Sequence, residues 1–346
     1  MKAPHSLSLL SSIIGSNLDL IQGAGGNTSV KDGDILWVKA SGYRLIDAID
    51  REIFVPINYQ GVIARLKNGE DDPVTSEVIQ TDGTEFLKPS IETTLHALMP
   101  HKYVIHVHSV NTIANAVLCD GEQKIGELLN GIKWSWVPYV RPGVPLTNEV
   151  QKVVKQRLDV LILANHGLVI GAETIGGIYR LLDTLEKKLF CIKRKVLNID
   201  EQKIRALAKN TNYKCPKYDF VHSLAFDKIS MEIASKSPLY PDHVVFIGPG
   251  PMWVGSESEA RSLLKQENRN DQKVLIIEHI GVLVYKEANK GVDDMLHCLT
   301  NVLLRIDAKS KLNHLTEEDE LELINWDAEK YRQDIKKINR NKVCKL

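Results

Sequence analysis

The sequence has no excess of basic charge, and this absence excludes one class of partners. Its 44 Lys and Arg residues balance its 44 Asp and Glu residues, so the formal net charge at pH 7 is zero. Proteins that bind nucleic acid through its phosphates normally carry a basic excess or a basic stripe, and this chain shows neither. We therefore expect no nucleic-acid partner.

Cysteine is scarce and long apolar runs are missing. The five cysteines are scattered, odd in number and without Cys-x-x-Cys spacing, which predicts free thiols rather than disulfides or a zinc knuckle. No run approaches the roughly 18 apolar residues of a transmembrane helix. The N-terminal stretch lacks the strong apolar core and cleavage site of a signal peptide. We expect a cytoplasmic protein with no membrane partner.

The composition is that of a globular protein, with 43% hydrophobic and 25% charged residues in a chain of 346. Strand and helix patterns alternate along it, which predicts an α/β protein, and an Asp-Gly-Asp turn indicates that part of the sheet is antiparallel. After a first helix within residues 1–20, the expected strands are 28–30, 35–41, 52–57, 103–109 and 159–167. The expected helices are 61–68, 89–100 with Ser90 as N-cap, 111–119 and 173–197.

A polar stretch over 198–216 predicts a domain boundary, with domains at 1–197 and 217–346 and a charged helical tail from about 316. Residues 160–189 align without gaps on 274–303, with nine identities in 30 positions. Two interpretations are open. The C-terminal domain is a degenerate second copy of the same strand–turn–helix unit, or an apolar strand before a helix gives this likeness by itself.

His106 and His108 lie one residue apart in a predicted strand. Side chains alternate along a strand, so both imidazoles face the same way and can chelate one metal ion. The alternative is a pair of hydrogen-bonded core histidines. His166 follows a buried strand in "ANHG", and three histidines with one open position form a catalytic zinc arrangement. For His166 alone, a turn histidine bonded to the backbone is the alternative.

Glu92 lies in the first turn of the predicted helix that begins near Ser90. An acid there stabilises the helix dipole, but a glutamate near zinc is also suited to be a fourth ligand or a general base. The helix start also offers backbone N–H groups to an anion.

The glycine-rich turn "GAGGNTS" lacks the ending of a P-loop and the spacing of a dinucleotide fingerprint. It can still bring backbone N–H groups and the side chains of Asn27, Thr28 and Ser29 near a phosphate. Ser41 and Gly42, in "KASG", offer a second anion contact. The alternative for both is an ordinary hairpin turn.

Together these segments resemble the class II aldolase/adducin family. The stretches "GGNTSVKDGDILWVKASGYRL", "PSIETTLHALMPHKYVIHVHS", "VPYVRPGVPLT" and "VLILANHGLVIG" are similar to that family's successive motifs, in its order, over roughly residues 8–195. The likeness is strongest to the aldolase part of long proteins that carry rhamnulose-phosphate aldolase-like and short-chain dehydrogenase parts. "YPDHVV" at 240–245 also resembles them. The chain ends before a dehydrogenase part, so we expect no hydride transfer.

The resemblance implies a three-layer αβα fold with a largely antiparallel central sheet, usually assembled as a homotetramer. It implies one zinc ion per chain, or another divalent metal, on His106, His108 and His166, with Glu92 as the catalytic glutamate. The substrate phosphate would be held by the residues that match the family's phosphate turns, which are Asn27, Ser41, Gly42 and Ser90. Sugar-phosphate aldolases of the fuculose type have a second serine where this chain has Ile91, which weakens the expectation of phosphate binding.

These observations predict a zinc-dependent lyase that cleaves or forms a carbon–carbon bond in a ketose phosphate or related hydroxy-ketone. Tyr139 and Arg141, in "VPYVRPG", are candidates for the acid on the aldehyde side and for substrate binding; a turn aromatic and a surface cation are the alternatives. The family's fold also serves an epimerase, a dehydratase and decarboxylases. It further serves adducin, a non-catalytic scaffold, but adducin-like members lose the metal histidines that this chain keeps.

The C-terminal half is not expected to hold a second metal triad. In the aligned copy, Ile280 stands at the position of His166, and His279 precedes it on the opposite face of the expected strand. Asp242 and His243 are the compact polar pair of that half. A turn after Pro241 explains them, and the alternative is a lid that closes over the substrate.

Overall fold

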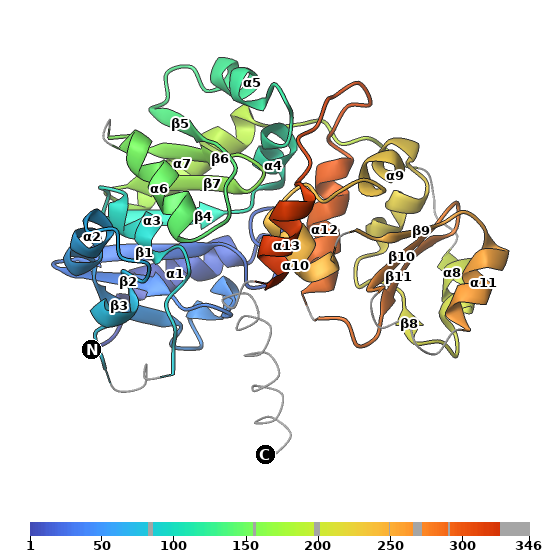
Figure 1. The fold of residues 1–346 in the computed structure, drawn as a ribbon, viewed down its shortest axis with the longest axis horizontal. Helices are drawn as coiled ribbons and strands as arrows, with labels where there is room; N and C mark the ends of the chain where they lie inside the picture. Colours follow the sequence, from blue (N-terminus) through green and yellow to red (C-terminus); the bar gives the residue numbers. More distant parts are fainter. Residues whose placement is uncertain are drawn as a thin grey trace. The chain divides into compact units, whose positions relative to one another are not determined.

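The computed structural model describes residues 1–81, 86–154, 157–196, 201–248, 250–265, 272–289 and 291–325. The described residues form two compact units (Figure 1). The first comprises Met1–Ala116 and Asp120–Phe190, and the second comprises Val117–Cys119 and Cys191–Asn325.

A seven-stranded sheet forms the centre of the first unit, in the order β3-β2-β1-β4-β7-β6-β5. All its neighbours are antiparallel except β5 and β6, so the largely antiparallel sheet expected from the sequence is confirmed. The strands are β1 (Asn27–Asp32), β2 (Ile35–Lys39), β3 (Phe54–Asn58), β4 (Tyr103–Val107), β5 (Trp134–Val137), β6 (Val160–Leu163) and β7 (Gly167–Ala172).

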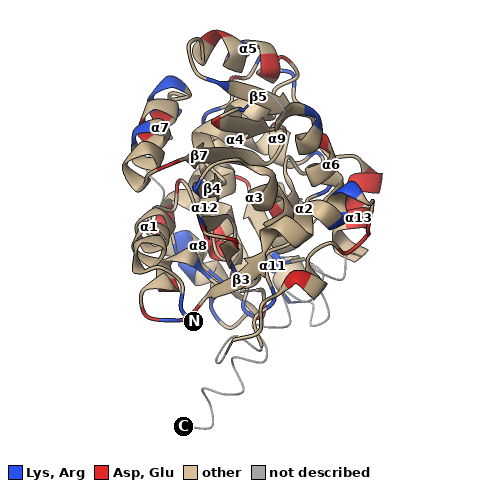
Figure 2. Cartoon of the chain, turned by 90° about the vertical axis from the view of Figure 1, so that its left-hand side faces the viewer, with Lys and Arg blue, Asp and Glu red and all other residues tan. Residues whose placement is uncertain are grey.

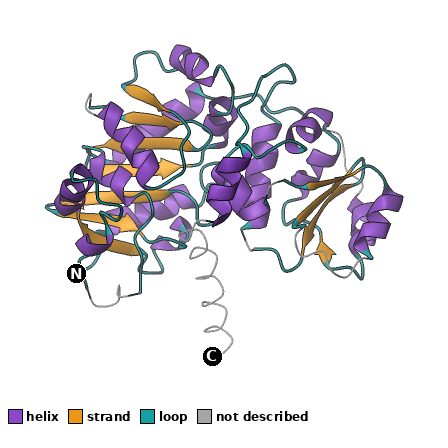
Figure 3. Cartoon of the chain, viewed as in Figure 1, coloured by secondary structure: helices purple, strands orange, loops and turns teal. Residues whose placement is uncertain are grey.

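Helices cover both faces of this sheet, as Figures 1 and 3 show. They are α1 (His5–Gly15), α2 (Tyr59–Lys67), α3 (Thr93–Leu98), α4 (Val110–Ala116), α5 (Gly121–Leu128), α6 (Val144–Val153) and α7 (Ile175–Lys188). On one face Ile105 and Val107 join the core of α1 and α7. On the other, Val104 joins the core of α3 and α6. Because side chains alternate along β4, its even-numbered residues, His106 among them, face α3.

The second unit is built on a four-stranded sheet in the order β8-β11-β10-β9. Its strands are β8 (Tyr213–Lys214), β9 (Met252–Val254), β10 (Val274–Ile277) and β11 (Gly281–Tyr285). Its helices are α8 (Glu201–Ala208), the 3₁₀ helix Asp219–Ala225, α9 (Lys228–Ala234), α10 (Pro241–Ile247), α11 (Glu257–Leu264), α12 (Val292–Leu303) and α13 (Glu317–Asn325).

This second sheet repeats half of the first. In both, the central hairpin has an antiparallel strand on one side (β4 or β8) and a parallel strand on the other (β5 or β9). The hairpin registers agree, because Leu163 pairs with Gly167 and the aligned Ile277 pairs with Gly281. The aligned turn residues Asn165 and His279 share a left-handed backbone, with φ of 53° and 55°. The topology therefore supports the interpretation of a degenerate second copy.

Three local expectations are corrected. The helix expected over 173–197 ends at Lys188, and Arg194 lies beyond it, where its guanidinium binds Asp227 and the carbonyl of Leu303. Residues 201–214, expected to be part of a linker, form α8 and β8 of the second unit. Asp242 and His243 lie in helix α10 rather than in a turn, because proline is tolerated at the first position of a helix. The tail expected to be helical from about 316 is a helix over Glu317–Asn325, and its remainder lies outside the described residues.

Charges of both signs are interspersed over the described elements that Figure 2 turns toward the viewer. None of the described helices is long and apolar enough to cross a lipid bilayer.

Candidate metal centre

Three histidines converge within the first unit. The ring of His106 lies 4.9 Å from that of His108 and 4.8 Å from that of His166, measured between ring centroids. Each offers a nitrogen, and these nitrogens lie within 4.8 Å of one another. All three side chains are buried. In the part of the chain that the structure describes, no other cluster of His, Cys, Asp and Glu has this metal-binding geometry.

Small residues bring the three rings together. His166 lies in the turn between β6 and β7, where Asn165 takes the left-handed conformation that asparagine tolerates. The next residue is Gly167, where a Cβ atom would lie 2.5 Å from the carbonyl oxygen of Val107. Any other side chain would force β7 away from the strand that carries the HxH pair. The "ANHG" sequence therefore places His166 at the centre through its neighbours.

The donor geometry fits a metal ion. The Nδ1 of His106 lies 3.2 Å from the carbonyl oxygen of Leu168, to which only a protonated Nδ1 can donate. That bond leaves the lone pair of neutral His106 on Nε2, as in metal-binding histidines with a backbone partner. The Nε2 atoms of His106 and His108 are 3.1 Å apart. Tetrahedral zinc with bonds of about 2.0–2.1 Å places its nitrogens at about this spacing, roughly 3.4 Å apart.

Glu92 completes the centre. It occupies the N-cap position of α3 without a side-chain capping hydrogen bond, and its side chain is buried. Its Oε1 lies 3.6 Å from Nε2 of His106 and 3.7 Å from Nε2 of His166, and it accepts no hydrogen bond from the described residues. A buried carboxylate oxygen without a donor is costly unless a cation lies beside it. The three imidazoles and this oxygen can therefore hold a divalent metal ion.

The pKa of Glu92 depends on positive charge at the triad. Burial by itself raises it. The positive charge of protonated His106 and His166, together with the hydrogen bond from Asn27, outweighs burial and lowers the pKa to about 2. Glu92 is therefore an anion at neutral pH when positive charge is present at the triad, whether protons or a metal ion supply that charge.

The expected anion-binding turns meet beside Glu92. Asn27 pairs with His106 across β1 and β4, and its Nδ2 donates to Oε2 of Glu92 at 2.7 Å and to Oγ of Ser90 at 3.1 Å. The backbone of Ser41 donates to the carbonyl of Lys88, and that of Ser90 donates to the carbonyl of Lys39. These two bonds hold the serine–glycine turn against the segment that leads to Glu92.

Two expectations about these turns are corrected. Thr28 points to the opposite face of β1, where its hydroxyl lies 2.6 Å from that of Ser11 in α1, so it is placed away from the centre. Ser90 is not the N-cap of α3, because the helix begins at Thr93 and its capping position belongs to Glu92. Alternation along β1 explains the first outcome. The second places Ser90 beside Asn27 instead.

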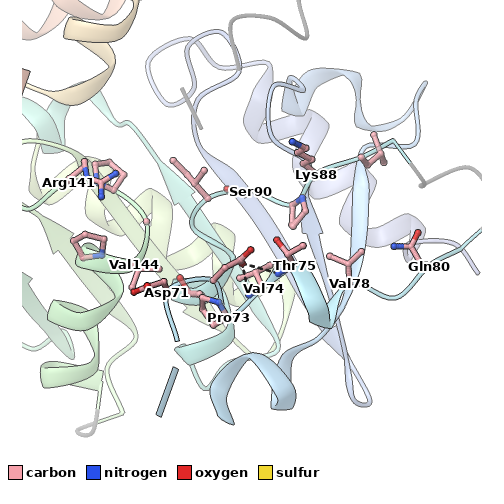
Figure 4. A pocket seen from close by; sticks show the side chains of 18 residues that line it. Asp71, Pro73, Val74, Thr75, Val78, Gln80, Lys88, Ser90, Arg141 and Val144 are labelled. Carbon is pink, nitrogen blue, oxygen red and sulfur yellow. Dashed lines mark hydrogen bonds between the residues drawn. The ribbon is translucent and has the colours of Figure 1, made fainter. Parts of the chain in front are cut away.

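Arg141 and Ser90 line a pocket of about 830 Å³ (Figure 4). The figure shows Arg141 and Lys88 on either side of Ser90, and Ile91 is among the lining residues. Tyr139 is half-buried after β5, and it is not part of the pocket lining. The structure thus places Arg141 beside one predicted substrate residue and does not join Tyr139 to that pocket.

Two residues near the centre were not singled out in the sequence. Lys39 is 2% exposed, and its Nζ donates to the carbonyls of Ala24 and Tyr43, so it ties the glycine-rich turn to the serine–glycine turn. A lysine at the end of an apolar strand, directly before "ASG", was the available signal. His96 is 0% exposed and contacts Asn27 and Ser29. It lies four residues after Glu92, which is one helical turn.

The sequence that builds this centre matches a known protein family. A family model described as the class II aldolase and adducin N-terminal domain matches residues 12–190.

The chain belongs to the class II aldolase and adducin family.

The matched stretch contains the whole metal centre, from the glycine-rich turn to "ANHG". Among curated proteins, the uncharacterized oxidoreductase YuxG of Bacillus subtilis (strain 168) is 29% identical over 193 residues. That stretch is 52% of this chain and 28% of YuxG, so the chain matches less than a third of that relative's length.

Solved structures of this family also resemble the chain. The N-terminal class II aldolase domain of a conserved protein from Thermoplasma acidophilum is 27% identical and covers 53% of this chain and 90% of its own, with a TM-score of 0.48. An L-fuculose 1-phosphate aldolase is 19% identical and covers 60% of this chain and 89% of its own, with a TM-score of 0.40.

The second unit, beyond the family match, carries its own buried polar group. His243 in α10 is 2% exposed, and neither ring nitrogen has a hydrogen-bond partner among the described residues. Burial, and to a lesser extent the charge of His314, lowers its pKa to about 3.

We expect this histidine to make the second unit less stable in acid. Unfolded, His243 has a pKa of about 6.5. Between pH 6.5 and 3 the unfolded chain therefore binds a proton that the native protein does not, so stability falls as the pH falls through this window. From pH 7 to 5 the loss is about 2 kcal/mol. Urea unfolding at both pH values should show a loss of stability about 2 kcal/mol larger in the parent protein than in His243→Gln, because the other histidines are the same in both. Equal losses in both proteins would contradict a neutral native His243.

Proposed function

We propose that this protein is a zinc-dependent lyase that cleaves or forms a carbon–carbon bond in a ketose phosphate or related hydroxy-ketone. The observation that carries the proposal is the cluster of His106, His108 and His166, two of which lie within 3.7 Å of the buried Oε1 of Glu92. Three imidazoles and a carboxylate are ligands that zinc favours, although another divalent metal suits the same set. The bound ion supplies Lewis-acid polarisation of the substrate's oxygens.

Glu92 is proposed as the proton-transfer group. Its Oε1 faces the triad, and its Oε2 is held by Asn27. In the bond-forming direction the carboxylate can take a proton from the carbon next to the carbonyl. In cleavage it can return a proton to that carbon after the carbon–carbon bond has broken, while the hydroxyl proton on the aldehyde side passes to the group that serves that side. Burial excludes bulk water from this exchange.

The surrounding turns would bind the substrate's anionic group. Backbone hydrogen bonds hold Ser41, which precedes Gly42, and Ser90 against neighbouring strands and turns, and the buried Nζ of Lys39 binds the carbonyls of Ala24 and Tyr43 in the two turns. Arg141 is proposed to bind the far end of the substrate from its place in the pocket beside Ser90. Tyr139 remains a proposed acid for the aldehyde side. A homo-oligomer, favoured as a tetramer, and a cytoplasmic location are proposed from the family and composition.

The test is product analysis with purified, zinc-loaded protein on matched phosphorylated and unphosphorylated ketoses. We expect a shorter hydroxy-ketone and an aldehyde, with the phosphorylated substrates preferred. A product with unchanged carbon number would identify an epimerase or dehydratase instead, and release of carbon dioxide from hydroxy-keto acids would identify a decarboxylase. Equal turnover of phosphorylated and unphosphorylated substrates would contradict the proposed phosphate site. Ile91 would then account for the result, because it stands where fuculose-type aldolases have a second serine. No turnover in the presence of bound metal would favour a scaffold.

A further inference from the structure

A buried hydrogen-bond chain runs behind Glu92, away from the triad. His96 projects from α3 and is fully buried. Its Nδ1 lies 2.7 Å from Oγ of Ser29, and its Nε2 is hydrogen-bonded to Oδ1 of Asn27. Asn27 in turn donates from Nδ2 to Oε2 of Glu92. The chain thus joins two residues of β1 to two residues of the helix segment, in the order Ser29, His96, Asn27, Glu92.

The direction of each hydrogen bond follows from the carboxylate. Ionised Glu92 only accepts, so the atom of Asn27 that faces it must be the amide nitrogen. The other end of that amide is then an oxygen, which also only accepts, so Nε2 of His96 must carry a proton and donate it. Burial lowers the pKa of His96 to about 3, so the ring is neutral at pH 7 and its Nδ1 is unprotonated. Nδ1 therefore accepts from the hydroxyl of Ser29.

We propose that His96 is a positioning residue that fixes the amide orientation of Asn27 and, through it, the carboxylate of Glu92. If the Asn27 amide turned over, its oxygen would face the carboxylate, and two acceptors would oppose each other in a buried site. The Nε2 proton of His96 prevents this, because its hydrogen-bond partner among the described residues is the Asn27 oxygen. The role in turnover rests on the proposed function of Glu92, whereas the amide orientation does not.

Two substitutions separate positioning from simple packing. In glutamine the side-chain amide nitrogen is reached from Cβ by the same number of bonds as Nε2 of histidine, so His96→Gln keeps a donor facing Asn27. In asparagine the amide is one bond shorter and corresponds to Nδ1, so His96→Asn loses that donor. Loss of an outer-shell partner typically costs about 10–100-fold, so we expect kcat of His96→Asn to fall in this range, with KM and metal content changed little. His96→Gln should recover most of it.

The orientation itself can be observed without turnover, in zinc-loaded, substrate-free protein labelled with ¹⁵N. We expect the side-chain NH₂ of Asn27 to exchange slowly with solvent in the parent and in His96→Gln, and quickly in His96→Asn. Ser29→Ala removes the donor to Nδ1 and should accelerate exchange to a smaller extent. If His96→Asn does not fold, exchange in Ser29→Ala tests the positioning role instead. Unchanged exchange in the folded variants, or equal kcat losses in His96→Gln and His96→Asn, would overturn the proposal. Slow exchange with no turnover in the parent would refute the proposed function alone.

Discussion

Replacement of His108 by alanine is expected to remove the metal ion and to lower turnover by at least about 100-fold. His108 offers a nitrogen 3.1 Å from that of His106, so its removal breaks the pair that grips the ion. Outer-shell changes already cost about 10–100-fold in metal affinity, and loss of a ligand should cost more. Elemental analysis of the purified variant should show well under one equivalent of metal per chain, against about one equivalent of zinc in the parent.

A matched control is His279→Ala. This histidine is 74% exposed in its side chain and lies in the aligned turn of the second unit. It should leave the metal content and turnover unchanged. The thermal unfolding of metal-free His108→Ala should remain cooperative, so that loss of metal is not a loss of fold. Full metal occupancy in His108→Ala would rule out the triad.

Replacement of Glu92 by glutamine is expected to lower kcat by about 10²–10⁴-fold, the range for a general acid–base group. Glutamine keeps the size of the side chain but cannot take up the proton. Asn27 can still donate to its oxygen, so the local hydrogen bond survives. Steady-state kinetics with zinc-loaded variant and parent measure the effect, and elemental analysis of the same samples separates the two roles.

Retained metal with lowered kcat would assign Glu92 to proton transfer, whereas lost metal would make it chiefly a ligand. Undiminished kcat would exclude the proposed role. Glu77→Gln is the control, because Glu77 is a largely buried carboxylate that pairs with Arg65 outside the centre. It should leave kcat unchanged, although the loss of its ion pair lowers stability slightly.

The sequence by itself determined the identity of the metal-centre candidates and the order of the elements around them. Alternation along an extended segment predicted His106 and His108 on one face, and their rings lie 4.9 Å apart although β4 ends at Val107. The motif order also predicted the family, which the match over residues 12–190 confirms. The hairpin of β1 and β2 followed from its Asp-Gly-Asp turn, because turn chemistry is local.

Tertiary structure decided which side chains serve that centre. Thr28 looked as suitable as Asn27 from composition, but pairing of β1 with β4 turns only Asn27 toward Glu92. Lys39 and His96 were not singled out in the sequence, because only packing buries them against the two turns and Asn27.

The second unit likewise shows what the sequence could predict and what only the tertiary structure added. An alignment with nine identities in 30 positions could not distinguish a repeat from two similar strand–helix segments. The matching strand order, hairpin register and left-handed turn favour a repeat, and the strand order depends on partners distant in sequence. Turns and the alternation of side chains along a strand depend on residues adjacent in the sequence. Hydrogen-bond partners and burial depend on contacts that the chain makes only when folded.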